Sequence, residues 1–388
     1  MDIRVYYFSF FERLPTMKSI RFVICIIAAM TISGCASIGP QSISAGREAY
    51  NMAVQHTNDQ ELLLNLVRIR YRDTLYFTSV ERIAATQELL QSVGVSAGAT
   101  QLNNSLGGAP AATTVTGIAT QALTMGPASI SINEKPTVFY VPVEGEKFVR
   151  QMMTPMNPDL LLMLVQSGWS LDRVFSVGLQ EINGLKNAPT AAGPTPSREP
   201  EFREFREAVK LLRALQREQL IDLVKIKGEG VELRFERTAN LRQETARLRE
   251  LLKLAPGRDR FRLVVGGEAP DAETIAISTR PLISALNYLS QGVDAPSADM
   301  KAGKVRQTVR SNGEVFDWQE LLAEVFHVHS SDKEPKDASV VIPYRGSYFY
   351  IEDNDLDTKS TFVLLTQLIA LHSVPASSNL PMSISFSK

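Results

Sequence analysis

The stretch VVIPYRGSYFYIEDNDLDTKSTFVLLTQLIAL, residues 340–371, decides the fold class of this chain. Two segments rich in β-branched and aromatic residues, Val340 to Tyr344 and Ser347 to Glu352, have the composition of β-strands. Only Arg345-Gly346 separates them, and two-residue loops are the commonest connections of antiparallel hairpins. The stretch therefore begins with a predicted β-hairpin.

A helix is expected directly after this hairpin. Either Asp355 or Asp357 can cap its first turn, and apolar residues continue through Leu371. Farther upstream, strand-like and helix-like segments interleave along the chain. An antiparallel hairpin among such segments predicts an α+β fold with mixed, largely antiparallel sheet elements and packed helices.

The other elements follow from apolar spacing and from turn residues. Residues 76–83 fit either a strand or a second helix. We expect helices over 42–71, 145–153, 171–185, 201–224 and 281–291, and strands over 136–142, 231–235, 260–265, 274–278 and 382–386.

The amino terminus has the pattern of a secretory signal. Lys18 and Arg21 are followed by an apolar run from Phe22 to Met30 and by small residues that lead into Cys35. The apolar run is shorter than the roughly 20 residues that a membrane-spanning helix needs. The alternative is a buried hydrophobic helix with a chance cysteine, but the small, turn-prone residues 36–48 argue against it.

The tetrapeptide Ile32-Ser33-Gly34-Cys35 resembles the lipobox of bacterial lipoproteins. The resemblance implies cleavage before Cys35 and lipid attachment to it, and two or more acyl chains hold a protein stably on a membrane. We therefore predict a signal peptide over residues 1–34, with Met17 as an alternative start, and a lipidated tether over 35–48. Because Ala36 follows the cysteine, lipoprotein sorting in a Gram-negative host implies the outer membrane, with the protein facing the periplasm.

Charge and cysteine content exclude several classes of function. The formal net charge is −1, whereas nucleic-acid-binding domains are basic, so no nucleic-acid partner is expected. Cys25 lies inside the predicted signal, which leaves Cys35 as the only cysteine after cleavage. An internal disulfide and a free thiol nucleophile are therefore not expected.

Residues 89–133 contain no Asp, Glu, Lys or Arg, although 21% of the chain is charged. Apolar and small polar residues alternate around 93–100 and 114–120, and turn residues lie between these segments. The pattern has the size of a transmembrane β-hairpin over residues 92–121, which needs several protomers to close a barrel. The alternatives are a flexible Gly/Ala/Thr-rich loop and a soluble hairpin packed against the body.

Proline content suggests where the chain divides. Four prolines in residues 187–200 predict an exposed linker and a domain boundary. On this basis residues 49–186 form an N-terminal α/β region that contains the insert 89–133, and residues 201–388 form a C-terminal α+β region.

Candidate metal ligands are few. His327 and His329 lie on one side of their segment if it is extended, and Asp332 is nearby. Because no third ligand has the spacing of a zinc site, a hydrated strand face is the preferred interpretation and no metal is assigned.

Three alternating aspartates, Asp353, Asp355 and Asp357, suggest a calcium loop. An EF-hand is excluded because Thr358 stands where glycine is required and Leu364 where a bidentate glutamate is required. Helix capping is the preferred explanation of the aspartates, and a looser calcium site is the alternative.

Arg68, Arg70 and Arg72 come at the end of the first predicted helix. Cations are favourable at the negative end of a helix, so a solvated helix end is the preferred interpretation. An anion or lipid-phosphate site is the alternative.

Catalytic motifs are missing from the sequence. It contains no GxxxxGK[ST], GxGxxG or GxSxG pattern, so neither a catalytic residue nor a cofactor is predicted. A hydrolase of the cell wall or of glycans would need converging carboxylates, and their spacing shows no such pair. We therefore expect a protein that is not an enzyme.

Three stretches together resemble a group of bacterial envelope lipoproteins to which no activity is assigned: LLLNLVRIRYRDT (62–74), VFYVPVEGEKFVRQMMTP (138–155) and PYRGSYFYIEDNDLDTKSTF (343–362). The resemblance covers most of residues 50–375. It implies an envelope location and identifies no catalytic or binding residue in this chain.

These observations favour a membrane-anchored envelope lipoprotein that acts as a non-enzymatic scaffold, assembly factor or accessory subunit. Its partners are the membrane, through lipid on Cys35, and an envelope protein or further copies of itself. The alternative is an oligomeric outer-membrane pore or secretion lipoprotein that inserts residues 92–121 as a hairpin.

Overall fold

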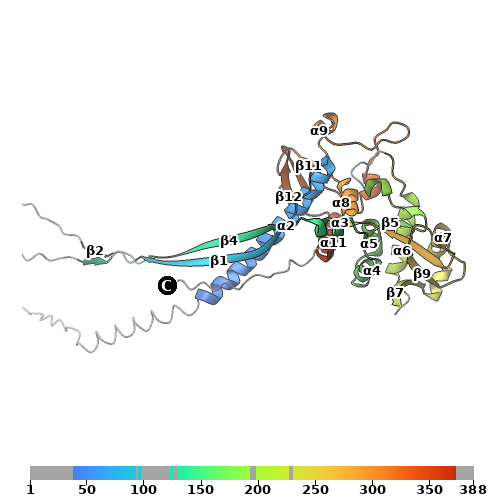
Figure 1. The fold of residues 1–388 in the computed structure, drawn as a ribbon, viewed down its shortest axis with the longest axis horizontal. Helices are drawn as coiled ribbons and strands as arrows, with labels where there is room; N and C mark the ends of the chain where they lie inside the picture. Colours follow the sequence, from blue (N-terminus) through green and yellow to red (C-terminus); the bar gives the residue numbers. More distant parts are fainter. Residues whose placement is uncertain are drawn as a thin grey trace, which may run out of the picture. The chain divides into compact units, whose positions relative to one another are not determined.

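Figure 1 shows a computed structural model of this chain, which describes residues 38–92, 95–97, 123–125, 129–192, 198–226 and 230–372. The chain divides into two compact units. One is Tyr76–Phe148, and the other combines Met1–Leu75 with Val149–Lys388. Helices and mixed sheets give an α+β fold, as the sequence predicted.

A six-stranded sheet, in the order β6-β5-β10-β9-β8-β7, lies in the larger unit. Neighbouring strands are antiparallel except β9 and β10, which are parallel. Helices α4, α5 and α6 contact this sheet. The strands are β5 Leu179–Ile182, β6 Leu185–Lys186, β7 Ile221–Ile226, β8 Gly230–Phe235, β9 Arg260–Val265 and β10 Thr274–Thr279.

The sheet contains strands from both sides of the predicted linker 187–200. Because β5, before the linker, pairs with β10, after it, the two sides fold together. Ala188 and Ala191 are fully buried, and Pro189–Ala192 forms a 3₁₀ turn, η1. The structure therefore divides the chain at the edges of Tyr76–Phe148 and not at the proline-rich segment.

The helix expected over 171–185 is shorter than predicted. Helix α5 ends at Gly178, and the chain continues as the β5–β6 hairpin. Asn183 and Gly184 have φ angles of 46° and 80°, which suit the two-residue turn that Asn-Gly favours. This turn signal overrides the helical spacing of the apolar residues.

A second, three-stranded sheet has the order β11-β13-β12. Its strands are β11 His329–Ser331, β12 Ala338–Tyr344 and β13 Ser347–Glu352. Arg345 and Gly346 have φ angles of 51° and 88°, which confirms the two-residue hairpin.

The helices of the described residues are α2 Ile38–Tyr71, α3 Glu146–Met153, α4 Pro158–Gln166, α5 Leu171–Gly178, α6 Arg203–Arg217, α7 Gln243–Leu252, α8 Leu282–Ser290, α9 Ser297–Lys301, α10 Gln319–Leu322 and α11 Leu356–His372, with a further 3₁₀ turn, η2, at Arg237–Leu241. Helix α2 begins at Ile38, so most of the tether expected over 35–48 is helical. The strand predicted over 382–386 lies outside the described residues.

The core of the larger unit centres on α8, whose residues Leu282, Leu286 and Leu289 are almost fully buried. The buried Arg280 precedes this helix. Its Nε donates to the carbonyl oxygen of Leu179 at 2.9 Å, and its guanidinium lies 4.1 Å from the centre of the Tyr288 ring. Burial lowers the pKa of Arg280 to about 10.

The end of α2 is held by a group of polar contacts. The Tyr71 hydroxyl donates to Asp299 at 2.7 Å, and Lys304 pairs with the same carboxylate at 2.7 Å. Arg345, in the β12–β13 turn, pairs with Asp73 at 2.8 Å. These contacts fix α2 against the three-stranded sheet and the segment around α9.

The smaller unit contains a long antiparallel ribbon formed by β1 (Thr78–Ser92) and β4 (Ser129–Pro142), which lie side by side in Figure 1. The pairing of β2 (Val95–Ala97) with β3 (Leu123–Met125) follows it. Residues 76–83 therefore enter a strand and not a second helix. We call the end of the ribbon at Thr78 and Pro142 its base. Near this base, the guanidinium of Arg82 lies 4.5 Å from the centre of the Phe139 ring.

Candidate functional site

Two distant segments are joined by backbone hydrogen bonds beside the three-stranded sheet. The N–H of Asp294 donates to the carbonyl of Val328, and the N–H of Val328 donates to the carbonyl of Gly292, both at 2.9 Å. This bridge places the loop after α8 against the segment that enters β11. Asp294 thereby comes next to the two histidines that flank Val328.

Asp294, His327 and His329 form a compact cluster, which we call the histidine cluster. The Nε2 atom of His327 lies 2.9 Å from the Oδ2 atom of Asp294, and the Nδ1 atom of His329 lies 3.8 Å from it. The two imidazole rings are 4.0 Å apart between centres. The hydrogen bond with Asp294 raises the pKa of His327 above its ordinary value.

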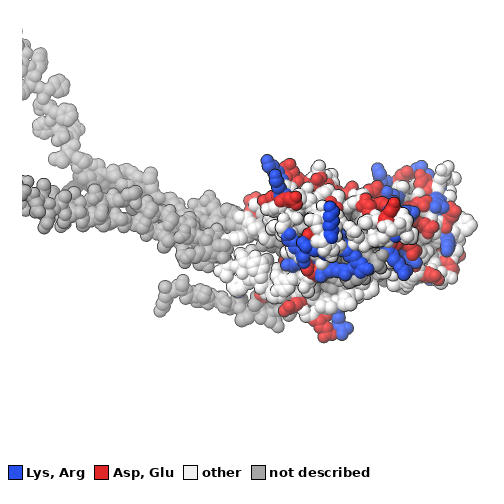
Figure 2. Space-filling model, turned by 90° about the horizontal axis from the view of Figure 1, so that it is seen from above, with Lys and Arg blue, Asp and Glu red and all other residues white. Residues whose placement is uncertain are grey.

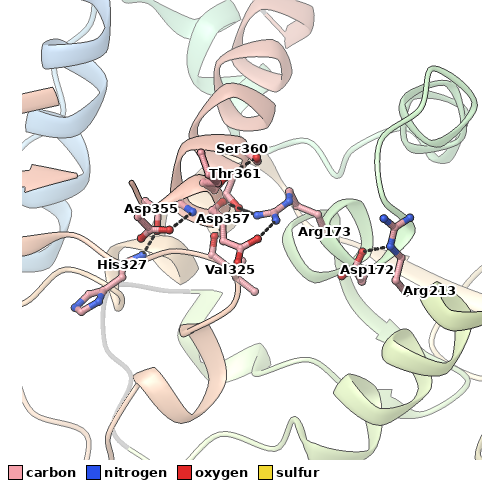
Figure 3. Close-up of polar contacts among 11 residues, drawn as sticks. Asp172, Arg173, Arg213, Val325, His327, Asp355, Asp357, Ser360 and Thr361 are labelled. Atoms are coloured by element: carbon pink, nitrogen blue, oxygen red, sulfur yellow. Dashed lines mark hydrogen bonds and ion pairs between the residues drawn. The ribbon is translucent and has the colours of Figure 1, made fainter. Parts of the chain in front are cut away.

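The start of α11 anchors the backbone at His327 (Figure 3). The Thr358 hydroxyl oxygen accepts the N–H of His327 at 2.9 Å, while the Thr358 N–H donates to the Asp355 carboxylate at 2.9 Å. The Thr361 hydroxyl donates to the carbonyl of Val325, two residues before His327. The start of α11 therefore holds the backbone of the segment that carries His327.

Arg173, on α5, holds the same helix start (Figure 3). Its guanidinium donates to the carbonyl and the carboxylate of Asp357 and to the Thr361 hydroxyl, each at 2.6 Å. Near it, Arg213 and Asp172 form a second ion pair at 3.6 Å.

The three aspartates of the suspected calcium loop have separate roles. Asp355 accepts from the first turn of α11 and is its cap, as one of the two alternatives predicted. Asp357 pairs with Arg173, and Asp353 pairs with Lys359, both at 2.6 Å. Because each carboxylate has its own protein partner, capping and pairing account for all three.

A cavity of about 730 Å³ adjoins the histidine cluster through Asp294, which forms part of its wall. Arg70 lines the same cavity, donates to Gln291 and to the carbonyls of Val293 and Arg306, and has its pKa lowered to about 10 by burial. The expectation of a solvated helix end is therefore wrong for Arg70.

The two neighbouring arginines differ from Arg70. Arg68 donates to Asn65 within α2 at 3.2 Å. Arg72 has a φ angle of 63° and takes the left-handed position that ends the helix, where the N–H of Asp73 bonds to the carbonyl of Arg68 at 2.8 Å. The three arginines thus do not converge on one anion site.

Sequence spacing identified the two histidines but not their carboxylate partner. Asp332, the expected partner, lies in the cavity wall, whereas Asp294, 33 residues before His327, reaches the imidazoles. The preference for a plain strand face rested on the lack of a third ligand, and Asp294 supplies one. The signal available in the sequence is Gly292, which follows α8 and permits the close approach of the two segments.

Cys35 and the turn of the predicted hairpin lie outside the described residues. Among the residues that the structure describes, no helix has both the length and the apolar character needed to cross a membrane. On the face seen in Figure 2, basic and acidic side chains intermingle. No family model, curated protein or solved structure matches this chain.

Proposed function

We propose that this chain is a membrane-anchored envelope lipoprotein that acts as a non-enzymatic scaffold or assembly factor, and that copies of it associate through the β1–β4 ribbon. One observation carries the proposal: within the described residues this ribbon is a two-stranded sheet, so each of its strands is an edge.

The length of the ribbon supports this role. The β1–β4 register runs through 14 residue pairs, from Thr78 opposite Pro142 to Ser92 opposite Ser129. A strand of 15 residues is about 50 Å long, whereas strands in globular proteins usually have 3–10 residues. An isolated two-stranded hairpin is at best marginally stable in water, and its open edges are templates for pairing with another chain. A ribbon of this length therefore calls for a partner.

Exposed apolar side chains at the base of the ribbon add a second reason. Phe139, Tyr140 and Val141 have 40%, 58% and 40% of their surfaces exposed within the single chain. Because successive residues of a strand point to opposite faces, Phe139 and Val141 expose apolar surface on one face of the ribbon and Tyr140 on the other, and exposed apolar surface favours association with a further copy.

A second candidate function, an oligomeric membrane pore or secretion channel, is favoured by the lack of charge in the far part of the ribbon. The pairs from Leu89 with Ile132 to Ser92 with Ser129 contain no charged residue, and the sequence stays uncharged from Leu89 to Asn133. Charged side chains on the lipid-facing side of a transmembrane β-strand are destabilising, so an uncharged ribbon end suits insertion.

The ribbon changes the predicted hairpin in one respect. Pairing extends the hairpin expected over 92–121 down to Thr78 and Pro142, so its base is charged and its far part is not. The second alternating segment, 114–120, lies outside the described residues.

A shortened ribbon tests the proposal without breaking its register. Ser79 and Val141 are paired, so residues 80–140 can be replaced by an Asn-Gly turn between them, which removes nearly the whole ribbon together with Phe139 and Tyr140. We expect the unchanged chain to form a multimer in detergent, and the shortened chain to have the mass of one protomer with an unchanged thermal unfolding midpoint of its body.

Two measurements separate the candidates. A single protomer for the unchanged chain, by light scattering of detergent extracts, would contradict association through the ribbon. Conductance across a planar bilayer, present with the unchanged chain and lost with the shortened one, supports the channel. A multimer that shows no conductance supports the role as a scaffold and excludes the channel.

A further inference from the structure

We infer that Asp294, His327 and His329 bind one divalent transition-metal ion, and that Zn²⁺ matches the site best. The inference concerns the larger unit alone and does not depend on the role of the ribbon.

The geometry of the histidine cluster is close to that of a metal site. Zinc lies about 2.0–2.2 Å from imidazole nitrogens and carboxylate oxygens, so two tetrahedral ligand atoms are about 3.3 Å apart. The nitrogen atoms of His327 and His329 lie 2.9 and 3.8 Å from the Asp294 oxygen, and all three ligand atoms lie within 4.8 Å of one another. Small rotations of the three side chains bring all three ligand atoms to bonding distance of one ion.

The backbone holds these ligands in place without the ion. The bridge between Val293 and Val328 fixes Asp294 against the histidines. His329 belongs to β11 and is opposite Tyr350 of β13, while Thr358 accepts the N–H of His327. Ligands carried by paired strands and an anchored loop lose little freedom when an ion binds.

The ligand types and the surrounding charge select the ion. Two imidazoles and one carboxylate suit zinc and its neighbours, whereas calcium and magnesium require oxygen ligands. The negative charges of Glu352 and Asp355 also attract positive charge at His327, which makes its surroundings favourable to a cation.

An ion can reach the cluster from solvent. The side chains of His327, His329 and Asp294 are 25%, 26% and 44% exposed. Three protein ligands leave one tetrahedral position for water, as in zinc sites that exchange a ligand. Asp294 also borders the 730 Å³ cavity, which can supply that water.

Zinc titration of the full chain tests the inference. The protein is extracted from membranes in detergent, freed of metal with a chelator and titrated with Zn²⁺ by calorimetry. We expect one Zn²⁺ per chain, and no comparable binding of Mg²⁺ or Ca²⁺. His329→Gln and Asp294→Asn should each weaken binding by at least about 100-fold, because even the partners of zinc ligands contribute 10–100-fold.

His56→Gln is the matched control, because it removes an exposed histidine of α2 that is not part of the cluster. This variant should bind one Zn²⁺ with unchanged affinity. Metal-free unfolding curves establish that each variant is folded, and Asp294→Asn, which preserves the shape of the side chain, decides the question if His329→Gln does not fold. A Zn²⁺ titration of the unchanged chain that does not reach saturation would overturn the inference. So would an Asp294→Asn variant that binds Zn²⁺ with the same affinity as the unchanged chain.

Discussion

A Cβ atom on Gly292 would lie 2.4 Å from the carbonyl oxygen of Phe326. No side chain fits in this space, because real Cβ contacts are longer. Two residues farther along each segment, Asp294 donates to the carbonyl of Val328. The absence of a side chain at Gly292 is thus what lets the loop after α8 meet the segment that carries the histidines.

Gly292→Ala should therefore destabilise the protein and separate the histidine cluster. We expect the free energy of unfolding to fall by about 1–3 kcal/mol, the usual cost of overpacking, as measured by urea denaturation. Gly266→Ala is the control, since the nearest atom to its added Cβ is 3.9 Å away, and it should change stability by less than about 1 kcal/mol. Equal effects of both substitutions would contradict the steric argument.

Arg280→Met should destabilise the core even though it removes a buried charge. The substitution removes the Arg280 donor of the Asn187 carbonyl and leaves the Leu179 carbonyl with the Asn187 side-chain amide alone, and an unsatisfied buried acceptor costs about 1–3 kcal/mol. Arg260→Met, on the exposed first residue of β9, should change stability by about 0.5 kcal/mol or less. Thermal unfolding of the two variants measures the difference, and a neutral Arg280→Met would show that the carbonyls find other partners.

Arg173→Ala should loosen the start of α11. The side chain of Arg173 is 13% exposed and makes three hydrogen bonds there, so we expect a loss of about 1–3 kcal/mol. Arg213→Ala removes the neighbouring pair with Asp172, whose partners are 37% and 41% exposed, and should cost less than about 1 kcal/mol. Hydrogen exchange of the α11 amides should quicken in the first variant alone, and unchanged exchange in it would argue against the anchor.

The carboxylate of Asp299 should make stability depend on pH in the acid range. Hydrogen bonds from Lys304 and Tyr71 lower its pKa below the ordinary value. A depressed folded-state pKa stabilises the protein above the unfolded pKa, about 3.9, and this stabilisation is lost as the pH falls through the folded value. In urea titrations, Asp299→Asn should therefore be less stable than the unchanged chain at pH 7, with a difference that shrinks below about pH 4. A constant difference would contradict this assignment.

Cys35→Ser should release the protein from membranes, because two or more acyl chains are needed to hold it there. Membrane fractionation and the intact mass of the extracted protein measure this effect. Cys25→Ser lies in the predicted signal and should leave both results unchanged. A Cys35→Ser protein that stays on membranes, with no mass change beyond the substitution, would refute lipid attachment at this residue.

Local signals in the sequence predicted much of the fold. The Arg345-Gly346 turn, the cap at Asp355 and the strands β8, β9 and β10 agree with the structure, because each depends on residues adjacent in the chain. The helix predicted over 171–185 is longer than α5 because the apolar spacing continues past Gly178, whereas Asn183-Gly184 is a strong turn signal that places a hairpin there.

The boundary expected at 187–200 illustrates a different kind of error. Prolines mark where regular structure is interrupted, but they do not reveal whether the strands on either side belong to one sheet. The pairing of β5 with β10 joins them across some 90 residues, which composition cannot show.

The sequence by itself determined the α+β class, the terminal hairpin and helix, and the uncharged segment between Leu89 and Asn133. Only the tertiary structure decided that Asp294 lies with His327 and His329, that Arg70 is turned into a cavity wall, and that β1 and β4 form one long ribbon. The reason is physical: turns, caps and amphipathic patterns act between near neighbours, whereas these three arrangements depend on hydrogen bonds and packing between segments far apart in the chain.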